Sequence, residues 1–519
     1  MAVPGSETLD LSRAMVLAAP SLADWLVVAP VVIPIIVGAV LLMFRHETKI
    51  QAGVAIVGLA AMLISNVLLL SRILDAGPVV MTMGRWLPPF GISFTADVLG
   101  ASLALTATLV ALICALYSIS DIGTLGRRYG FYPFLMLMMA GVSGSFLTGD
   151  IFNLYVWFEV FLISSFGLLI LGSEHRQLDG ATKYAILNLI GTTLFLTATA
   201  LLYGVFGTLN MADIAVKAGN VREGAPLITL AVFFLLAFGM KAAAFPVNFW
   251  LPASYHTPRI VTAALFGAIL TKIGVYALLR VVVMLFPLER AILSGVIAWV
   301  AAATMILGVL GALAQTDIRR ALGFLVISSV GNILVGLALG SGEGLAGSIF
   351  YTFHSMIVTA ALYLLAGTMK GLGGSYSLRS LSGLYAAHPM IAAFALLLML
   401  ASAGLPPASG LWPKILLVQA SLDAGQGWLA FAVLLSGFLT TVALGRVFIL
   451  TIWRQHEGEA LVEKTSPMFG YVTLGVLAVA VIFMGLYPQP VIDIAENAAR
   501  GLLDGSLYID AVFPGGQRP

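Results

Sequence analysis

Long apolar runs separated by short polar loops dominate this 519-residue chain. A membrane-spanning helix needs about 20 mainly apolar residues, and runs of that length recur about fourteen times here. The loops are short and often marked by Gly, Pro, Asn or Asp, so no soluble domain fits between the runs. The pattern predicts an all-α integral membrane protein with helices near 25–44, 50–71, 95–118, 131–149, 151–171, 182–206, 226–250, 259–283, 291–314, 318–339, 345–369, 389–421, 428–453 and 468–488.

Composition supports the membrane class and excludes several others. The mean hydropathy is +1.03, with 60% hydrophobic and only 10% charged residues, whereas an ordinary soluble domain has about 25% charged residues. The net charge of +2 comes without a basic cluster, so nucleic acid is not an expected partner. The single cysteine, Cys114, lies in an apolar run, and the six histidines show no ligand spacing. We therefore expect no disulfide framework, no iron–sulfur cluster and no cysteine-ligated zinc site.

The loop charges indicate an orientation in the membrane. The first apolar run, 25–44, is too long for a cleaved signal segment and is expected to stay in the membrane. Thirteen Lys and Arg residues fall in one alternate set of loops and nine in the other. The positive-inside rule places the richer set in the cytoplasm and both termini on the outer side.

Two of the predicted helices carry a break of the kind found in transporters. Pro246 lies inside the stretch 238–252, and the stretch 402–413 contains three prolines just before Lys414. Non-helical backbone at membrane depth needs protein groups or a water-filled cavity to satisfy it. A break beside a lysine in each half of the chain indicates two inverted repeats with ion sites at their interface. Pro and Gly are also common in membrane helices generally, and this plainer interpretation stays open for either break alone.

The repeat hypothesis divides the chain into four parts. Residues 1–130 hold the first three helices, 131–285 a first repeat of helices four to eight, and 286–455 a second, inverted repeat of helices nine to thirteen. The part 456–519 holds the last helix and a polar tail. From about Asn497 this tail is expected to be frayed or bound to a partner.

A few charged residues lie where a membrane protein rarely tolerates them. Glu159, Lys241 and Lys272 fall inside apolar runs, and Lys414 follows the second break. An ionisable side chain at the centre of a membrane helix costs roughly 2.5–3.5 kcal/mol on insertion scales, so such residues usually line an ion path. Plainer alternatives are a structural carboxylate for Glu159, a packing lysine for Lys272 and a snorkelling side chain for Lys414.

These residue types fit proton transfer better than catalysis. Desolvation lowers the pKa of a buried lysine and a nearby carboxylate raises it, so a Glu–Lys pair that changes its separation would load and release a proton. His354 could relay that proton, because a histidine titrates near neutrality, or it could be a satisfied core residue. Lysine offers no oxygen for Na+, and any Na+ would have to use Asp150, Glu159 or backbone carbonyls.

Four stretches of the chain carry a family resemblance when they are taken as a set. They are GDIFNLYVWFEVFLIS at 149–164, MKAAAFP through WLPASYHTP to LTKIGVYALLR at 240–280, QTDIRR at 315–320, and AGLP at 403–406 with Lys414 after it. The first resembles the fifth-helix motif of the D subunit of Mrp-type Na+/H+ antiporters, and the second resembles its seventh and eighth helices. The resemblance covers about residues 30–455.

The resemblance implies a fold, a set of roles and a set of partners. The fold would have about fourteen helices with two inverted five-helix repeats and discontinuous helices 7 and 12, shared with subunits of respiratory complex I and membrane-bound hydrogenases. Glu159 and Lys241 would form a coupled pair, Lys272 would pass the proton inward, and Lys414 would be the terminal site. The subunit would exchange Na+ or K+ for H+ in a complex with A, B, C, E, F and G type subunits. That complex would lie in the bacterial cytoplasmic (inner) membrane, and the subunit would have no cofactor of its own.

The chain departs from this family in its second half. Many relatives carry a lysine five residues after the position of His354, where this chain has Thr359, and the stretch 324–329 lacks a histidine often found there. The second-half relay must then depend on His354, on serines and on water, or it is interrupted. Side chains that would extend the relay are Ser328, Ser329, Lys183 and His256.

Two other functions stay open. The same fold serves as a pumping module of NADH–quinone oxidoreductase or of a membrane hydrogenase, where redox energy drives the protons and the chain would be a translocase subunit. The string at 153–158 and the Thr271-Lys272 step favour the antiporter over these. The second rival is a stand-alone transporter of a small solute, and the near absence of polar groups at the breaks argues against it.

Overall fold

Helices make up most of the structure. The computed structural model describes residues 14–16, 21, 24–218, 225–455 and 468–514. In chain order the elements are η1 (Asp24–Val27), α1 (Ala29–Met43), α2 (Gln51–Ala76), β1 (Val79–Thr82), η2 (Met83–Arg85), β2 (Ser93–Ala96), α3 (Val98–Asp121), α4 (Thr124–Arg128), α5 (Phe131–Leu147), α6 (Ile151–Leu169), α7 (His175–Phe206), α8 (Met211–Ala218), α9 (Leu227–Ala242), α10 (Trp250–Ser254), α11 (Ile260–Leu265), η3 (Phe266–Leu270), α12 (Thr271–Leu278), η4 (Leu279–Leu285), α13 (Pro287–Leu313), α14 (Ile318–Leu339), α15 (Gly342–Gly373), α16 (Leu384–Ala387), α17 (Pro389–Ala403), α18 (Leu411–Asp423), α19 (Gly427–Phe448), η5 (Ile449–Trp453), α20 (Met468–Leu486), α21 (Gln489–Leu503) and α22 (Ser506–Val512).

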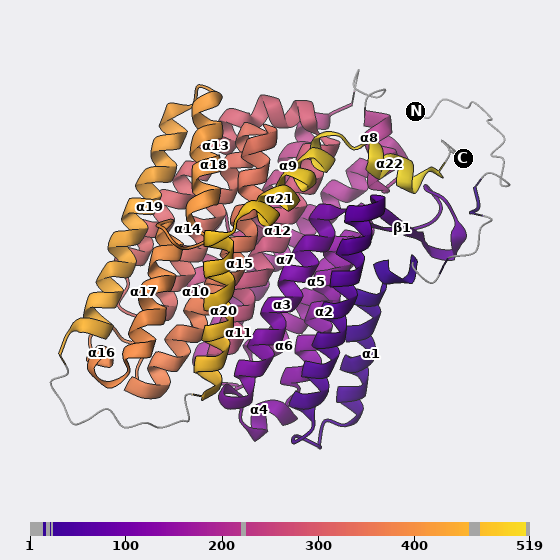
Figure 1. The fold of residues 1–519 in the computed structure, drawn as a ribbon. Helices are drawn as coiled ribbons and strands as arrows, with labels where there is room; N and C mark the ends of the chain where they lie inside the picture. The colour runs from indigo at the N-terminus through magenta and orange to yellow at the C-terminus, as the bar shows by residue number, and fades with distance from the viewer. Residues whose placement is uncertain (1–13, 17–20, 22–23, 219–224, 456–467, 515–519) are drawn as a thin grey trace.

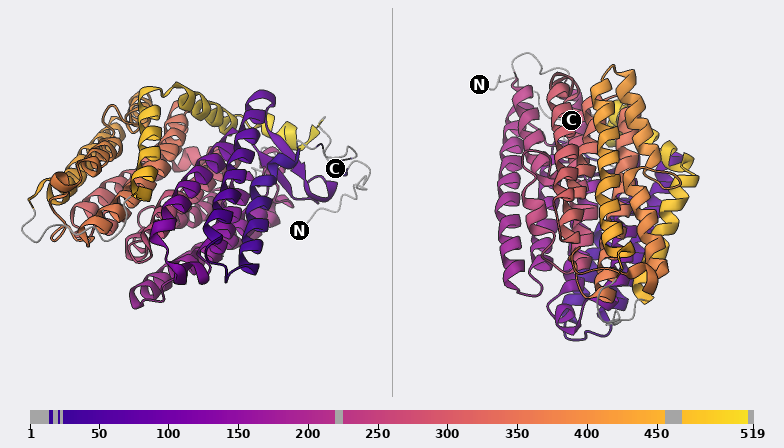
Figure 2. Two further views of the ribbon diagram at one scale, coloured as in Figure 1. Left: turned by 60° about the horizontal axis from the view of Figure 1, so that its bottom comes forward. Right: turned by 90° about the vertical axis from the view of Figure 1, so that its left-hand side faces the viewer.

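The long helices stand side by side, with the N-terminal α1 and α2 on the right of Figure 1 and α17 and α19 on the left. Seen after a 90° turn, they run roughly parallel to one another (Figure 2). Among the described residues, ten helices are long and apolar enough to cross a membrane, and α1, α5, α9 and α17 are shorter apolar helices. The predicted all-α membrane class is therefore confirmed. The exact number of spans and the two repeats stay predictions.

The C-terminal segment returns from the α19 end of the bundle towards the N-terminal end (Figure 1). Helix α20 contacts α3, α15 and α17, α21 contacts α3 and α15, and α22 contacts α8 and the strands. The tail predicted to be frayed or partner-bound from Asn497 is therefore helical as far as Val512 and packed on its own chain, so that prediction is wrong there. The reason is amphipathic spacing, because α21 buries one face, formed by Ala495, Ala498, Ala499 and Leu502.

A β-hairpin, which the apolar-run pattern did not predict, lies between α2 and α3. Its strands are antiparallel, with Val79 opposite Ala96 and Thr82 opposite Ser93. Phe94 makes a further bridge to Thr148, just before α6. Strands of four residues are far too short to cross a membrane. Their role is local, since they fix the chain immediately before α3.

Both predicted breaks are present in the structure. Helix α9 stops at Ala242, because Ala243 takes a left-handed conformation (φ 61°) and the next amide, that of Ala244, bonds back to Gly239 O at 2.9 Å. The predicted helix 389–421 is divided into α17 and α18, with Gly404 (φ 84°) at the end of α17. A residue in this left-handed conformation closes a helix, because the amides at and just beyond it bond back to carbonyls of the last turn. These two open helix ends form the candidate site.

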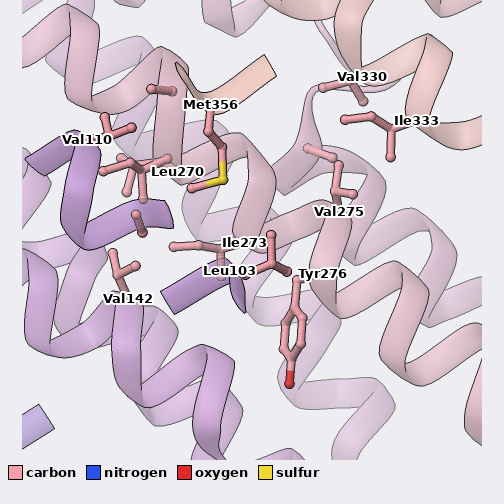
Figure 3. Close-up of a cluster of buried hydrophobic side chains, with 14 of the residues drawn as sticks. Leu103, Val110, Val142, Leu270, Ile273, Val275, Tyr276, Val330, Ile333 and Met356 are labelled. Carbon is pink, nitrogen blue, oxygen red and sulfur yellow. The ribbon is translucent and has the colours of Figure 1, made fainter. Parts of the chain in front are cut away.

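The most deeply buried part of the bundle is the helix that runs from α11 to η4, together with α15. Figure 3 shows side chains of this span, including Leu270, Ile273 and Tyr276, meeting residues of α3, α5, α14 and α15. The one polar atom of Tyr276, its hydroxyl, donates to Phe146 O at 3.0 Å. The span is therefore held on all sides, and Lys272 lies in its middle.

Close approach of helix backbones replaces the hydrophobic effect as the packing force in a membrane protein. Helices α13 and α14 show this, because a Cβ at Gly331 would lie 2.8 Å from Ala301 O, and one at Gly308 would lie 2.6 Å from Ser328 N. Ser328 itself donates from Oγ to Met305 O at 2.9 Å. Small residues are therefore required along this contact.

Gly331→Ala is expected to destabilise the protein by about 1–3 kcal/mol, the usual cost of overpacking. The added methyl would force α13 and α14 apart against main-chain atoms, which cannot move aside as a side chain can. Thermal unfolding of the purified protein measures the effect. Gly295→Ala in α13 is the matched control, because a Cβ there meets nothing within 4 Å. Equal unfolding temperatures for the two variants would contradict this account of the packing.

Candidate functional site

Lys241 lies in the last turn of α9, at the first open helix end. The residue is 5% exposed, and its Nζ donates to Asn188 O of α7 at 3.3 Å. The ring centroid of Phe158 is 6.0 Å from the same nitrogen. A cation is favoured at a helix C-terminus, where the main-chain carbonyls point outward. Lys241 is therefore a buried lysine at a helix end, and its amine is held by a carbonyl of the neighbouring helix α7.

Glu159 lies on α6, next to Phe158, and is half-buried. One carboxylate oxygen, Oε1, is buried and has no hydrogen-bond partner. Its charge acts on Lys241, yet no ion pair joins these two residues, although both lie in the described part of the chain. The structure thus places the expected pair on neighbouring elements and keeps its members apart.

Lys272 lies on α12, a short α-helical segment between the π-helical segments η3 and η4. It is completely buried, and its Nζ donates to Gly267 O of η3 at 2.9 Å. π-helical insertions are frequent at functional sites. Two residues further on, a Cβ at Gly274 would lie 2.6 Å from Ala242 N. The segment that carries Lys272 is therefore pressed directly against the open end of α9.

Lys414 lies in the first turn of α18, opposite the second open helix end. Its Nζ donates to Ala403 O at 2.6 Å and to Ser402 O at 3.3 Å, both at the end of α17. The side chain is thus directed at the carbonyls of a helix C-terminus. The alternative of a snorkelling side chain does not fit this geometry, because the ammonium is held inside the bundle.

His354 lies on α15, and the charges of both Lys414 and Lys272 act on it. It lines a cavity of about 40 Å³, which is large enough to admit water. Hydroxyl groups dominate its polar lining, and Ser355 Oγ donates to Ser329 Oγ at 3.1 Å. The polar residues on the wall are Ser328, Ser329, Tyr351, His354, Ser355, Thr359, Tyr363, Ser402 and Thr440.

The cavity reaches towards the anchor of each neighbouring lysine. Thr359, on its wall, lies beside Gly267, because a Cβ on that glycine would be 3.1 Å from the Thr359 methyl. Ser402, at the other side, supplies one of the carbonyls that bind Lys414. A hydroxyl-lined space, with Thr359 on its wall, thus occupies the interval between Lys272 and Lys414.

Two of the predicted relay residues lie away from this group. Lys183 is exposed and forms an ion pair with Asp179 one helical turn away, at 2.6 Å. His256 follows α10, where its Nδ1 lies 2.8 Å from Pro252 O. Asp150, a candidate for Na+, accepts from Asn153 N at 2.8 Å as the N-cap of α6. The structure does not bring these residues into contact with the buried lysines.

The sequence analysis missed one buried ion pair. Arg280 Nη2 and Asp97 Oδ1 are 2.6 Å apart, with side chains 1% and 9% exposed. The rings of Tyr276 and Tyr508 lie 5.5 and 5.1 Å from the guanidinium carbon. Arg280 is one of the nine charges counted for the outer loops, yet it also lies within the predicted helix 259–283, which already indicated a position within the span. Asp97 gave no such signal, because it precedes α3 as an ordinary N-cap residue does.

Comparisons with known proteins agree with this architecture. The family model described as "NADH:quinone oxidoreductase/Mrp antiporter, TM" matches residues 148–440. The chain is 36% identical over 493 residues to the D subunit of the Na(+)/H(+) antiporter of Alkalihalophilus pseudofirmus, covering 94% of this chain and 99% of that one. A chain in the structure of the Mrp complex from Dietzia sp. superposes with a TM-score of 0.87 at 28% identity, covering 95% of this chain and 100% of that one. A chain of respiratory complex I from Thermus thermophilus gives 0.79 at 26% identity, covering 92% and 100%.

Proposed function

Because this chain belongs to the family of NADH:quinone oxidoreductase and Mrp antiporter membrane subunits, we propose that it is the proton-translocating D-type subunit of a multisubunit Na+ or K+/H+ antiporter. It is a transporter subunit rather than an enzyme. The relative from Alkalihalophilus pseudofirmus is named as the D subunit of a Na(+)/H(+) antiporter, and this chain aligns with 99% of its length. The likeness to the Mrp complex exceeds that to complex I in both identity and TM-score, which favours the antiporter over the redox-driven pump.

The observation that carries the proposal is the set of three buried lysines that are bound only by main-chain carbonyls. Lys241, Lys272 and Lys414 each donate to such oxygens, and none forms an ion pair within the described residues. An ammonium group without a counter-ion is unfavourable in a low-dielectric interior, whereas the neutral amine has no charge to desolvate. A lysine in this setting gains or loses its proton when a neighbouring charge changes.

The proton path runs along the bundle from one open helix end to the other. The charge of Glu159 acts on Lys241, whose helix end packs against the segment bearing Lys272. From there His354 and the waters of the hydroxyl-lined cavity connect to Lys414. The cavity supports a continuous second-half relay in spite of the missing lysine at Thr359, since water and hydroxyl groups pass protons without carrying a permanent charge.

The outer surface of the bundle is suited to lipid and to other membrane subunits. Large apolar side chains are exposed along its outer helices, as on Val57 and Ile64 of α2 and Leu434 and Phe438 of α19. Contiguous apolar surface of this kind marks a membrane or protein contact. The partners are A, B, C, E, F and G type subunits in a bacterial cytoplasmic membrane, with both termini on the outer side.

Inverted vesicles from antiporter-deficient cells test this function. With the complete set of subunits, added Na+ or K+ is expected to dissipate a preformed proton gradient, whereas this chain alone is expected to do nothing. Activity from the chain alone would instead indicate an independent transporter. Proton pumping that needs NADH or another electron donor, without cation exchange, would overturn the proposal in favour of a redox-driven complex.

A further inference from the structure

The segment 404–410, which separates α17 from α18, touches the ring of His354. Ser409 is completely buried, and its Oγ lies 2.8 Å from His354 Nδ1. At the next position, a Cβ on Gly410 would lie 3.0 Å from Cε1 of the same ring. The break is therefore packed on the edge of the imidazole that carries Nδ1 and Cε1.

The position of Ser409 outside a helix decides what its hydroxyl can bind. A buried serine inside a helix commonly donates to a carbonyl of the preceding turn, as Ser421 of α18 does to Leu417 O at 2.7 Å. Ser409 precedes α18 and has no such carbonyl in its own helix. Its hydroxyl is directed instead at an imidazole nitrogen of α15, which brings a residue of the break into contact with the proton path.

The histidine is the group that most needs such a constraint. Of the side chains on the cavity wall in the described part of the chain, His354 is the one whose ordinary titration range lies near neutral pH. A neutral imidazole has one donor and one acceptor nitrogen. A hydrogen bond at one nitrogen therefore decides which of the two nitrogens carries the ring proton. An unconstrained ring would present either nitrogen to the cavity.

We propose that Ser409 is a positioning residue of this pathway: its hydroxyl donates to Nδ1 of His354 and keeps the ring proton on Nε2. The inference rests on the proposed function for its consequence in transport. The same segment continues directly into α18, so it fixes the ring of His354 and the helix that carries Lys414 together. A movement of the break would alter both groups at once.

The test begins with the tautomer. The purified complete complex is prepared with ¹⁵N-labelled histidine, and His354→Gln identifies the His354 signals by difference. We expect the unaltered ring to be protonated at Nε2. Ser409→Ala is expected to give a mixture of tautomers, and Ser409→Thr, which retains the hydroxyl, to restore the original spectrum. Ser421→Ala is the matched control, a buried serine whose hydroxyl stays on its own helix, and leaves the His354 signals unchanged.

Transport gives the second measurement. Ser409→Ala is expected to lower cation-dependent proton movement about tenfold, the factor that the loss of one hydrogen bond implies, and Ser409→Thr to recover it. If Ser409→Ala does not assemble, Ser409→Cys replaces it, with the same expected change in the His354 signals. A His354 spectrum unaltered by Ser409→Ala or Ser409→Cys overturns the inference. This outcome is separate from failure of the proposed function, because the spectrum does not depend on transport.

Discussion

Lys241→Ala is expected to reduce cation-dependent proton movement by at least about 100-fold, the lower limit of what a positioned proton donor contributes. The side chain is the one buried amine at the open end of α9, where Asn188 O holds it and the charge of Glu159 acts on it. Without the Lys241 amine, the half-buried carboxyl group of Glu159 has no proton acceptor on α9. The measurement is gradient dissipation in inverted vesicles that contain the complete complex.

Two controls separate chemistry from folding in that experiment. Lys241→Met keeps most of the side-chain volume and removes only the amine, so it is expected to fail as completely as Lys241→Ala. Lys49→Ala removes an exposed lysine from the loop between α1 and α2, and is expected to keep full exchange. Normal activity of either Lys241 variant in an assembled complex would remove this lysine from the pathway.

Arg280→Met is expected to destabilise the protein by about 3–5 kcal/mol, because it leaves a carboxylate buried without its partner. Asp97 also accepts from Gly100 N at 2.9 Å as the cap of α3, so the stranded charge cannot easily turn away. The guanidinium carbon lies near the rings of Tyr276 and Tyr508, and its loss would also loosen α22. Thermal unfolding and the fraction of assembled complex on gel filtration measure the effect.

The double variant Asp97→Asn with Arg280→Met distinguishes a stranded charge from lost packing. Asparagine still caps α3, and both charges are gone, so most of the stability is expected to return. Asp179→Asn is the control, because its partner Lys183 and the carboxylate itself are largely exposed and such pairs contribute about 0–1 kcal/mol. A double variant no more stable than Arg280→Met would show that the ion pair acts through packing alone.

Taken together, these sites show one arrangement used twice. In each half of the chain a helix stops inside the bundle beside a buried lysine, which donates to Asn188 O of α7 in the first half and to Ala403 O of α17 in the second. Lys241 belongs to the helix that ends, whereas Lys414 belongs to the helix that follows the break. The difference means that a shift of the segment 404–410 would move Lys414 relative to its carbonyls, while Lys241 moves with α9 itself.

The sequence determined the features that depend on neighbouring residues. Apolar runs of sufficient length gave the membrane class, Pro and Gly inside two of them marked the breaks, and four charged residues in or beside apolar runs gave the candidate path. Each of these is a local property, since length, backbone geometry and desolvation act on one segment at a time. Apolar runs are also why two features were not predicted. Helix α21 is amphipathic and the strands β1 and β2 are short, so neither contains an apolar run of the required length.

Only the tertiary structure decided which groups meet. Arg280 pairs with Asp97 across 183 residues and His354 with Ser409 across 55, and no local pattern encodes contacts at such separations. The structure likewise kept Glu159 out of direct contact with Lys241 and turned Lys183 towards Asp179 on the surface. The physical reason is that the cost of burying a charge follows from the apolar segment around it, which the sequence shows. The partner that satisfies the charge depends on the packing of the whole bundle.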